Sequence, residues 1–149
     1  MLRVGTVGTS SIMRTIQEAI RLTDGMECRV VYSRTEEQGR AFAAEMGVPE
    51  HCTDYAAMLE RSDLDLIDIA SPNRFHVEQA LAALEHGKHV IVEKPAAVTR
   101  GDVQRLIDAA RANGVYFFEA ITTLFMPQYE ACRLLLPKLG RIEQAHITY

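Results

Sequence analysis

Two patterns of hydrophobic and polar residues alternate along the first 120 positions. Short apolar runs have the length and the flanking residues of buried strands; they cover residues 2–7, 27–32, 66–70, 89–92 and 116–119. Between them, apolar residues recur at helical spacing; they are Ile12, Ile16, Ala19 and Ile20, then Ala41, Phe42 and Ala44, then Tyr55, Met58 and Leu59, then Val77, Ala80, Leu81 and Leu84, and finally Val103, Leu106, Ile107 and Ala110. This alternation predicts an α/β fold, a doubly wound parallel sheet with helices on both faces.

Residues at the ends of the helical repeats predict where the helices begin and end. The N-caps that we expect have short polar side chains that accept backbone N–H bonds; they are Thr35, Asp54 and Asn73, and Thr99 precedes the last of these helices. Glycine ends a helix readily because it adopts the left-handed conformation; Gly47, Gly87 and Gly114 stand at such places.

The pattern changes after Glu119. Residues 127–136 read as one more helix, closed by Pro137 and Gly140. Residues 142–149 then alternate between apolar and polar side chains, which predicts a half-buried strand of the antiparallel type. We therefore expect one domain over residues 1–120, and over residues 121–149 the connecting helix and first strand of a second, α+β domain whose remainder is absent from this sequence.

Composition and charge narrow the class of protein. The chain has 149 residues, of which 48% are hydrophobic and 24% charged, as in ordinary soluble globular proteins. The net charge is −4 and the basic residues are scattered, so we expect no nucleic-acid partner. No apolar run approaches the ~20 residues of a membrane span, and residues 1–8 have a strand pattern rather than that of a signal peptide. We expect no membrane association.

Cysteine and histidine give no sign of a metal site. Cys28, Cys52 and Cys132 are widely spaced, without a C-x-x-C motif, which favours reduced packing thiols in a cytoplasmic protein. The histidines at positions 51, 86 and 89 are too scattered to form a metal-ligand set.

The turn after the first strand has the position of a phosphate-binding loop. A dinucleotide fingerprint reads G-x-G-x-x-G between a strand and a helix; here Gly8 is present, but Ser10 and Met13 replace the other two glycines. Backbone N–H groups at a helix N-terminus favour a phosphate, and Ser10 adds a hydroxyl. The loop therefore fits dinucleotide binding, with an ordinary strand-to-helix turn as the alternative.

The end of the second strand indicates which dinucleotide would bind. NAD sites usually carry an acidic residue there, on the ribose 2′-hydroxyl; this chain has Ser33-Arg34-Thr35. The guanidinium of Arg34 would attract a 2′-phosphate, which a carboxylate would repel. This favours NADP over NAD, although NAD stays possible and Arg34 alone would also suit a solvated position beside a helix cap.

The sequence "VIVEKP" places Glu93 and Lys94 at the carboxyl end of a buried strand. In a doubly wound sheet that end faces the ligand. An ammonium there can polarise a carbonyl or exchange a proton with a hydroxyl. A plain ion pair at a strand end is the alternative interpretation.

Four stretches occur in order with intact spacing: "VGTVGTSSI", "YSR", "DLIDIASPNRFHVEQALAALEHGKHVIVEKPAAVT" and "FEA". Together they resemble the amino-terminal half of the Gfo/Idh/MocA oxidoreductase family, which includes glucose-fructose oxidoreductase and inositol dehydrogenase. The resemblance covers essentially the whole chain, and its most specific part lies between Ser71 and Pro95. It implies a Rossmann fold and a nicotinamide-dependent oxidoreductase that acts on sugars, polyols or related alcohols and carbonyls.

The resemblance also implies roles for individual residues. The pyrophosphate would be held by Gly8, Thr9, Ser10, Ser11 and Ile12, and the adenosine ribose by Ser33 and Arg34. Ser71, Pro72 and Asn73 would line the cofactor's ribose and pyrophosphate, with His76 close by. Glu93 would orient the site and Lys94 would touch the reacting oxygen. In this family the proline of the E-K-P motif often follows a cis bond, and the missing second domain would supply most of the substrate pocket and a homo-oligomer interface.

The substrate and the class of protein stay open. The stretch "EAITTLFMPQY" departs from the aromatic, arginine-containing sequence common in the family, so the usual substrate contacts are in doubt. A module that binds a nucleotide or senses redox state without turnover is an alternative, but it would have no need of Lys94. A Rossmann-like methyltransferase would favour an acidic residue where Ser33 and Arg34 stand.

Overall fold

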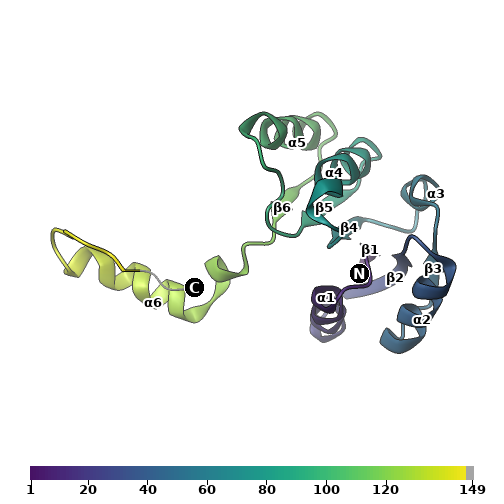
Figure 1. Ribbon diagram of the computed structural model, residues 1–149, viewed down its shortest axis with the longest axis horizontal. Helices are drawn as coiled ribbons and strands as arrows, with labels where there is room; N and C mark the ends of the chain where they lie inside the picture. Colours follow the sequence, from purple (N-terminus) through teal and green to yellow (C-terminus); the bar gives the residue numbers. More distant parts are fainter. Residues whose placement is uncertain (147–149) are drawn as a thin grey trace.

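The computed structural model describes residues 1–146, which contain one six-stranded parallel sheet (Figure 1). The strands are β1 (Leu2–Val7), β2 (Met26–Tyr32), β3 (Glu50–Cys52), β4 (Leu66–Ile69), β5 (His89–Val92) and β6 (Phe117–Glu119). Their order is β3-β2-β1-β4-β5-β6, and every neighbouring pair is parallel. The predicted fold class is confirmed. The three-residue strand β3 was not predicted, because so short a segment has no readable period.

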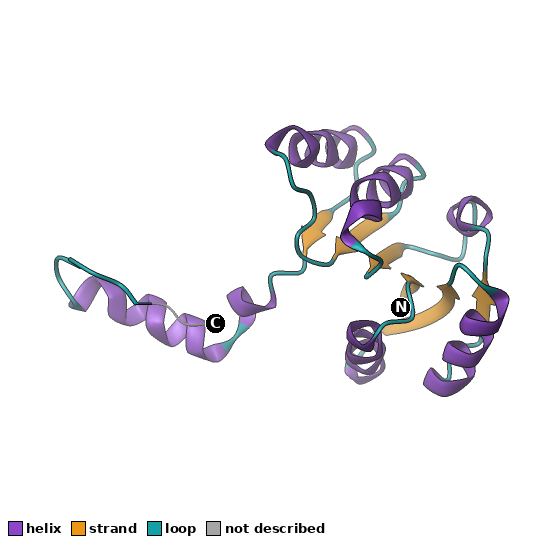
Figure 2. Ribbon diagram, in the orientation of Figure 1, coloured by secondary structure: helices purple, strands orange, loops and turns teal. Residues whose placement is uncertain are grey.

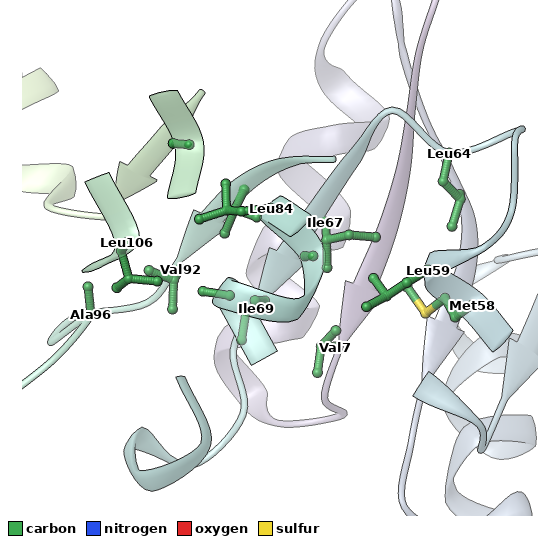
Figure 3. Packing of buried hydrophobic residues seen from close by; sticks show 14 of the residues in the cluster. Val7, Met58, Leu59, Leu64, Ile67, Ile69, Leu84, Val92, Ala96 and Leu106 are labelled. Carbon is green, nitrogen blue, oxygen red and sulfur yellow. The ribbon is translucent and has the colours of Figure 1, made fainter. Parts of the chain in front are cut away.

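Helices cover both faces of the sheet (Figure 2). The covering helices are α1 (Ser11–Leu22), α2 (Glu36–Met46), α3 (Tyr55–Leu59), α4 (His76–Glu85) and α5 (Arg100–Ala112). A further helix, α6 (Pro127–Leu135), follows β6 and lies away from the sheet. Short 3-10 turns lie at Asn73–Phe75, Thr122–Phe125 and Leu136–Lys138. Buried residues of α3, α4 and α5, such as Leu59, Leu84 and Leu106, pack with Ile67 and Val92 of the sheet (Figure 3). Helices α1 and α2 pack on the opposite face.

Most of the predicted helix starts are confirmed. The side chains of Thr35, Asp54 and Thr99 each accept a hydrogen bond from the backbone N–H three residues further on. The prediction for Asn73 is wrong: Asn73 begins a 3-10 turn, and α4 starts at His76 without a side-chain cap. The extended backbone of Pro72 leads directly into this tight turn, so α4 begins two residues later than it would if Asn73 were its N-cap.

Two helices bury only part of the side that was predicted: Ile20 of α1 and Phe42 of α2 are buried as expected, and other predicted residues are not. In α1 the buried residues are Met13, Gln17 and Ile20, whereas Ile12 is 42% exposed. In α2, Phe42 and Ala43 are buried, whereas Ala41 and Ala44 are exposed. One residue turns the helix by about 100°, so a small error in the assumed face moves an alanine or isoleucine out of the core.

The segment after β6 makes no core. Every residue from 121 to 146 is exposed, including those of α6. The helix is present as predicted, but residues 142–146 form no strand. A lone amphipathic strand has no neighbour to supply its ladder of hydrogen bonds. The last part of the predicted strand, residues 147–149, lies outside the described residues.

Candidate functional site

The candidate site lies at the carboxyl edge of the sheet, where β1 and β4 are neighbours. The chain leaves β1 toward α1 on one face and β4 toward α4 on the other, and such a reversal opens a crevice in doubly wound sheets. Two adjoining hollows occupy this place, with volumes of about 560 and 480 Å³. Both are lined by Ser10, Ala70, Ser71 and Pro72.

The loop after β1 brings backbone close to backbone. Gly8 has φ +115°, and a Cβ at this position would lie only 2.8 Å from the carbonyl oxygen of Ala70. Only glycine fits there without strain. Ser10 caps α1 by accepting a hydrogen bond from the N–H of Met13 at 3.5 Å. The remaining N–H groups of the first turn have no partner within the helix, so they suit an anion.

Met13 explains how the loop works with one glycine of the usual three. Its side chain is fully buried and packs with Val31, Phe42 and Ala70. It therefore fills the space between helix and sheet that a third glycine would close by tighter packing. The single glycine that remains is the one whose backbone conformation and close contact demand it.

The first hollow extends over the end of β2. Ser33 is buried and Arg34 exposed, and both line the hollow with Tyr32 and Gln38. Arg34 is the one charged side chain among the described residues that line it, and no carboxylate is among them. The electrostatic character of this hollow therefore favours an anionic group.

The second hollow extends over the end of β5. Its lining includes Glu93, which is half-buried, and Lys94, which is exposed. The peptide bond between Lys94 and Pro95 is cis, as the family resemblance implies. The hollow also reaches Thr122 in the segment after β6.

Gln79 is a site residue that sequence reasoning missed. It lines the first hollow, and its Oε1 accepts a hydrogen bond from the Ser71 hydroxyl at 2.6 Å. Its backbone carbonyl accepts a hydrogen bond from the hydroxyl of Tyr55 at 2.9 Å, and the ring of Tyr55 packs at 5.3 Å from that of Tyr32. The sequence did hold one signal for Gln79: it is a polar residue directly before the buried Ala80, on a helix that follows the end of a strand.

His76 lies beneath the crevice, between the loop after β4 and the loop after β5. Its ring is fully buried, with Nε2 2.8 Å from the carbonyl oxygen of Ser71 and Nδ1 2.9 Å from that of Pro95. The first carbonyl belongs to the loop after β4 and the second to the loop after β5. His76 lines neither hollow, so its contact with a cofactor stays a prediction.

The structure gathers nearly all of the predicted site residues at one edge of the sheet. Of the thirteen, all except Ser11 and His76 line one or both hollows: Gly8, Thr9, Ser10, Ile12, Ser33, Arg34, Ser71, Pro72, Asn73, Glu93 and Lys94. No set of three metal-ligating side chains occurs within residues 1–146, and the cysteines are free. Within the same range, no helix is long and apolar enough to cross a membrane.

The sheet order, the reversal between β1 and β4 and the glycine turn at a helix N-terminus together define a dinucleotide-binding Rossmann fold. The model of the oxidoreductase family with an NAD-binding Rossmann fold, Gfo/Idh/MocA, matches residues 2–121. The chain therefore belongs to this family.

Relatives and solved structures agree with this assignment. The chain is 34% identical, over its whole length, to the NADP(+)-dependent scyllo-inositol 2-dehydrogenase of Bacillus subtilis and 39% identical over 116 residues to the 1,5-anhydro-D-fructose reductase of Ensifer adhaerens. A 3-ketoreductase from Actinomadura kijaniata, solved with NADP and TDP-benzene, superposes with a TM-score of 0.87 at 30% identity, over 92% of this chain and 42% of that one. The chain spans 45% of the inositol dehydrogenase and 34% of the anhydrofructose reductase, so it corresponds to less than half of these relatives.

Proposed function

We propose that this chain is the cofactor-binding part of an oxidoreductase that prefers NADP(H) and acts on a sugar, a polyol or a related alcohol or carbonyl. The observation that carries the cofactor preference is the charge of the first hollow: Arg34 and Ser33 line it at the end of β2, without a carboxylate. A guanidinium makes planar, charge-assisted hydrogen bonds with a phosphate. The relatives named above support the substrate class, since one is an inositol dehydrogenase and another an anhydrofructose reductase.

The residues present fit such a cofactor. Because Gly8 has no side chain and lies close to Ala70, backbone N–H groups are accessible at the N-terminus of α1. Residues 8–12 would hold the pyrophosphate there. Ser33 and Arg34 would hold the phosphorylated ribose, and Ser71, Pro72 and Asn73 would line the crevice between. When bound, the nicotinamide supplies the hydride acceptor or donor.

Lys94 and Glu93 are the groups that we place at the reacting end. The Nζ of Lys94 would donate a hydrogen bond to the substrate oxygen, or take its proton when an alcohol is oxidised. Glu93, next to it on the wall of the second hollow, would orient this ammonium. A module that only senses the cofactor would have no use for a lysine at this wall.

The segment after residue 120 would begin the substrate domain. Its apolar side chains from Leu124 to Ile142 are exposed, as expected of a surface that joins further structure. We propose that such a second domain completes the substrate pocket and carries a homo-oligomer interface, in a protein of the cytoplasm.

A binding titration tests the proposal. Dissociation constants for NADPH and NADH are measured for the wild type, Arg34→Ala and the matched control Arg40→Ala, whose exposed arginine lies on α2 and does not line the hollow. Loss of hydrogen bonds to a charged phosphate costs ~1.5–3 kcal/mol, so Arg34→Ala should weaken NADPH binding about tenfold to a hundredfold and leave NADH binding nearly unchanged. Equal losses for both cofactors would reject the 2′-phosphate contact. Failure of either cofactor to bind the wild type would reject the function.

A further inference from the structure

Asp68 is a buried carboxyl group directly below the crevice. It lies on β4 and is 6% exposed. Its Oδ1 has no hydrogen-bond donor within the part of the chain that the structure describes. Side chains two residues apart on a strand share a face and are separated by ~6.6 Å, so Asp68 stands one step below Ala70, which lines both hollows.

The groups around Asp68 come from four elements. Thr6 of β1 is its partner in the sheet register, and Gln17 of α1 donates hydrogen bonds to Thr6 Oγ1 at 2.8 Å and to the sulfur of Cys28 at 3.2 Å. The side-chain N–H groups of Gln17 are therefore used by Thr6 and Cys28 and are not donated to Asp68. From β2 comes Cys28, and from the end of β5 comes Glu93. Only Cys28 and Glu93 of these four neighbours can titrate.

An unpartnered carboxylate in such a place is costly, so the neutral acid is favoured. Burial, and after it the negative charge of Glu93, raises the pKa of Asp68 to about 7. Burial likewise raises the pKa of the Cys28 thiol, which therefore stays neutral. Asp68 is thus a buried group beside the crevice that can change its charge near neutral pH.

We infer that Asp68 senses the charge of the ring in the second hollow and gives up its proton when that ring is cationic. The inference rests on the proposed function, in which Glu93 and Lys94 mark the nicotinamide end of the crevice. The oxidised nicotinamide ring carries a positive charge and the reduced ring carries none. An opposite charge nearby favours the ionised form of a carboxyl group.

The proton balance is simple. Asp68 is protonated before NADP⁺ binds and passes its proton to the buffer as the complex forms, with no bond made or broken elsewhere. Affinity for NADP⁺ should therefore rise with pH as the pH approaches 7 from below. Each unit by which the cation lowers the pKa of Asp68 would change this affinity about tenfold. NADPH should lack the part of this gain that comes from Asp68. Ionisation of the 2′-phosphate affects the binding of both forms and cancels in the ratio of the two affinities.

The experiment measures both dissociation constants by isothermal titration calorimetry, between pH 5.5 and 8, on the 149-residue chain. Each titration is run in two buffers with different ionisation enthalpies, which counts the protons released. The variants are Asp68→Asn, which keeps the shape and removes the titration, and Asp108→Asn as the matched control, since Asp108 is exposed on α5.

The expected result is a severalfold rise with pH in the affinity for NADP⁺ relative to NADPH, and a larger release of protons for NADP⁺ than for NADPH. The 2′-phosphate, with a second pKa of about 6, releases protons in both complexes, so the difference between them reports Asp68. Asp68→Asn should abolish both effects and Asp108→Asn should retain them. If Asp68→Asn does not fold, equal proton release for the two cofactors in the wild type still overturns the inference. An unchanged pH dependence in a folded Asp68→Asn protein also overturns it. A wild type that binds neither cofactor rejects the proposed function itself.

Discussion

Helices α4 and α5 and helix α6 have the same kind of sequence but different surroundings. All three carry apolar residues at helical spacing. Leu84 of α4 and Leu106 of α5 are fully buried against the sheet, whereas Leu134 and Leu135 of α6 are 61% and 53% exposed. Periodicity therefore predicts that a helix forms and which side is apolar, but burial requires a partner surface. Residues 1–120 contain that surface, and residues 121–146 have none among the described residues.

The largest difference should appear in stability. Leu84→Ala leaves a cavity in the core between α4 and the sheet, and such changes cost ~2–5 kcal/mol of unfolding free energy. Leu135→Ala in α6 removes an exposed side chain and should change it by no more than ~0.5 kcal/mol. Urea unfolding of both variants checks the pair. Similar losses would mean that α6 packs on the sheet in solution.

The buried carboxyl group of Asp68 and the exposed one of Glu130 should differ in how they make stability depend on pH. Because burial raises the pKa of Asp68 to about 7, above its value in the unfolded chain, the folded state holds a proton that the unfolded chain releases at lower pH. Stability should therefore fall as the pH rises from about 4 to 7, by up to a few kcal/mol. Asp68→Asn should flatten this fall. Glu130→Gln on α6, where the carboxylate is exposed, should leave it in place; the same flattening in both variants would contradict the assignment to Asp68.

Lys94 and Lys138 are both exposed lysines, but only Lys94 lines the crevice. In the complete enzyme, Lys94→Met should keep NADPH binding and lower kcat by about 10² or more, since general acid–base catalysis contributes that much. Lys138→Met, in the segment after β6, should leave turnover near that of the wild type. Near-normal turnover of Lys94→Met would refute its role at the reacting oxygen.

The smallest effect concerns two glycines with positive φ. Gly8 has φ +115° and faces the Ala70 carbonyl, whereas Gly140 has φ +67° and open space around it. Alanine should cost backbone strain of about 1–3 kcal/mol at Gly8 and less at Gly140. Only Gly8→Ala should weaken NADPH binding, because only its loop lies at the crevice. Thermal unfolding and a cofactor titration separate the two effects, and full NADPH affinity in Gly8→Ala would contradict the close-approach argument.

Local signals predicted most of the fold. Five strands, and the helix caps Thr35, Asp54 and Thr99, depend on contacts within a few residues, so they are legible in the sequence. The errors share another cause. The buried face of α1, the late start of α4 after Pro72 and the absence of a strand over residues 142–146 depend on what the chain packs against, which periodicity does not contain.

The residues of the site likewise fall into those that local sequence signals predicted and those that only the structure revealed. Gly8, Arg34 and Lys94 were predicted because each follows a strand, and parallel strands bring such residues to one edge. Gln79 was missed because its place depends on the hydrogen bond that it accepts from Ser71. Asp68 was missed because its environment is made by Thr6 of β1, Cys28 of β2 and Glu93 after β5. Contacts between residues far apart in the chain are what the structure adds.

Amide chemical-shift mapping tests the central claim most directly. NADPH is titrated into the ¹⁵N-labelled 149-residue chain and the backbone amide shifts are followed. The account predicts saturable changes in residues 8–12, 33–34 and 71–79, at the carboxyl edge of the sheet, and none in α6. Changes confined to the opposite edge of the sheet, or no change at saturating NADPH, would contradict the assignment of this crevice as the cofactor site.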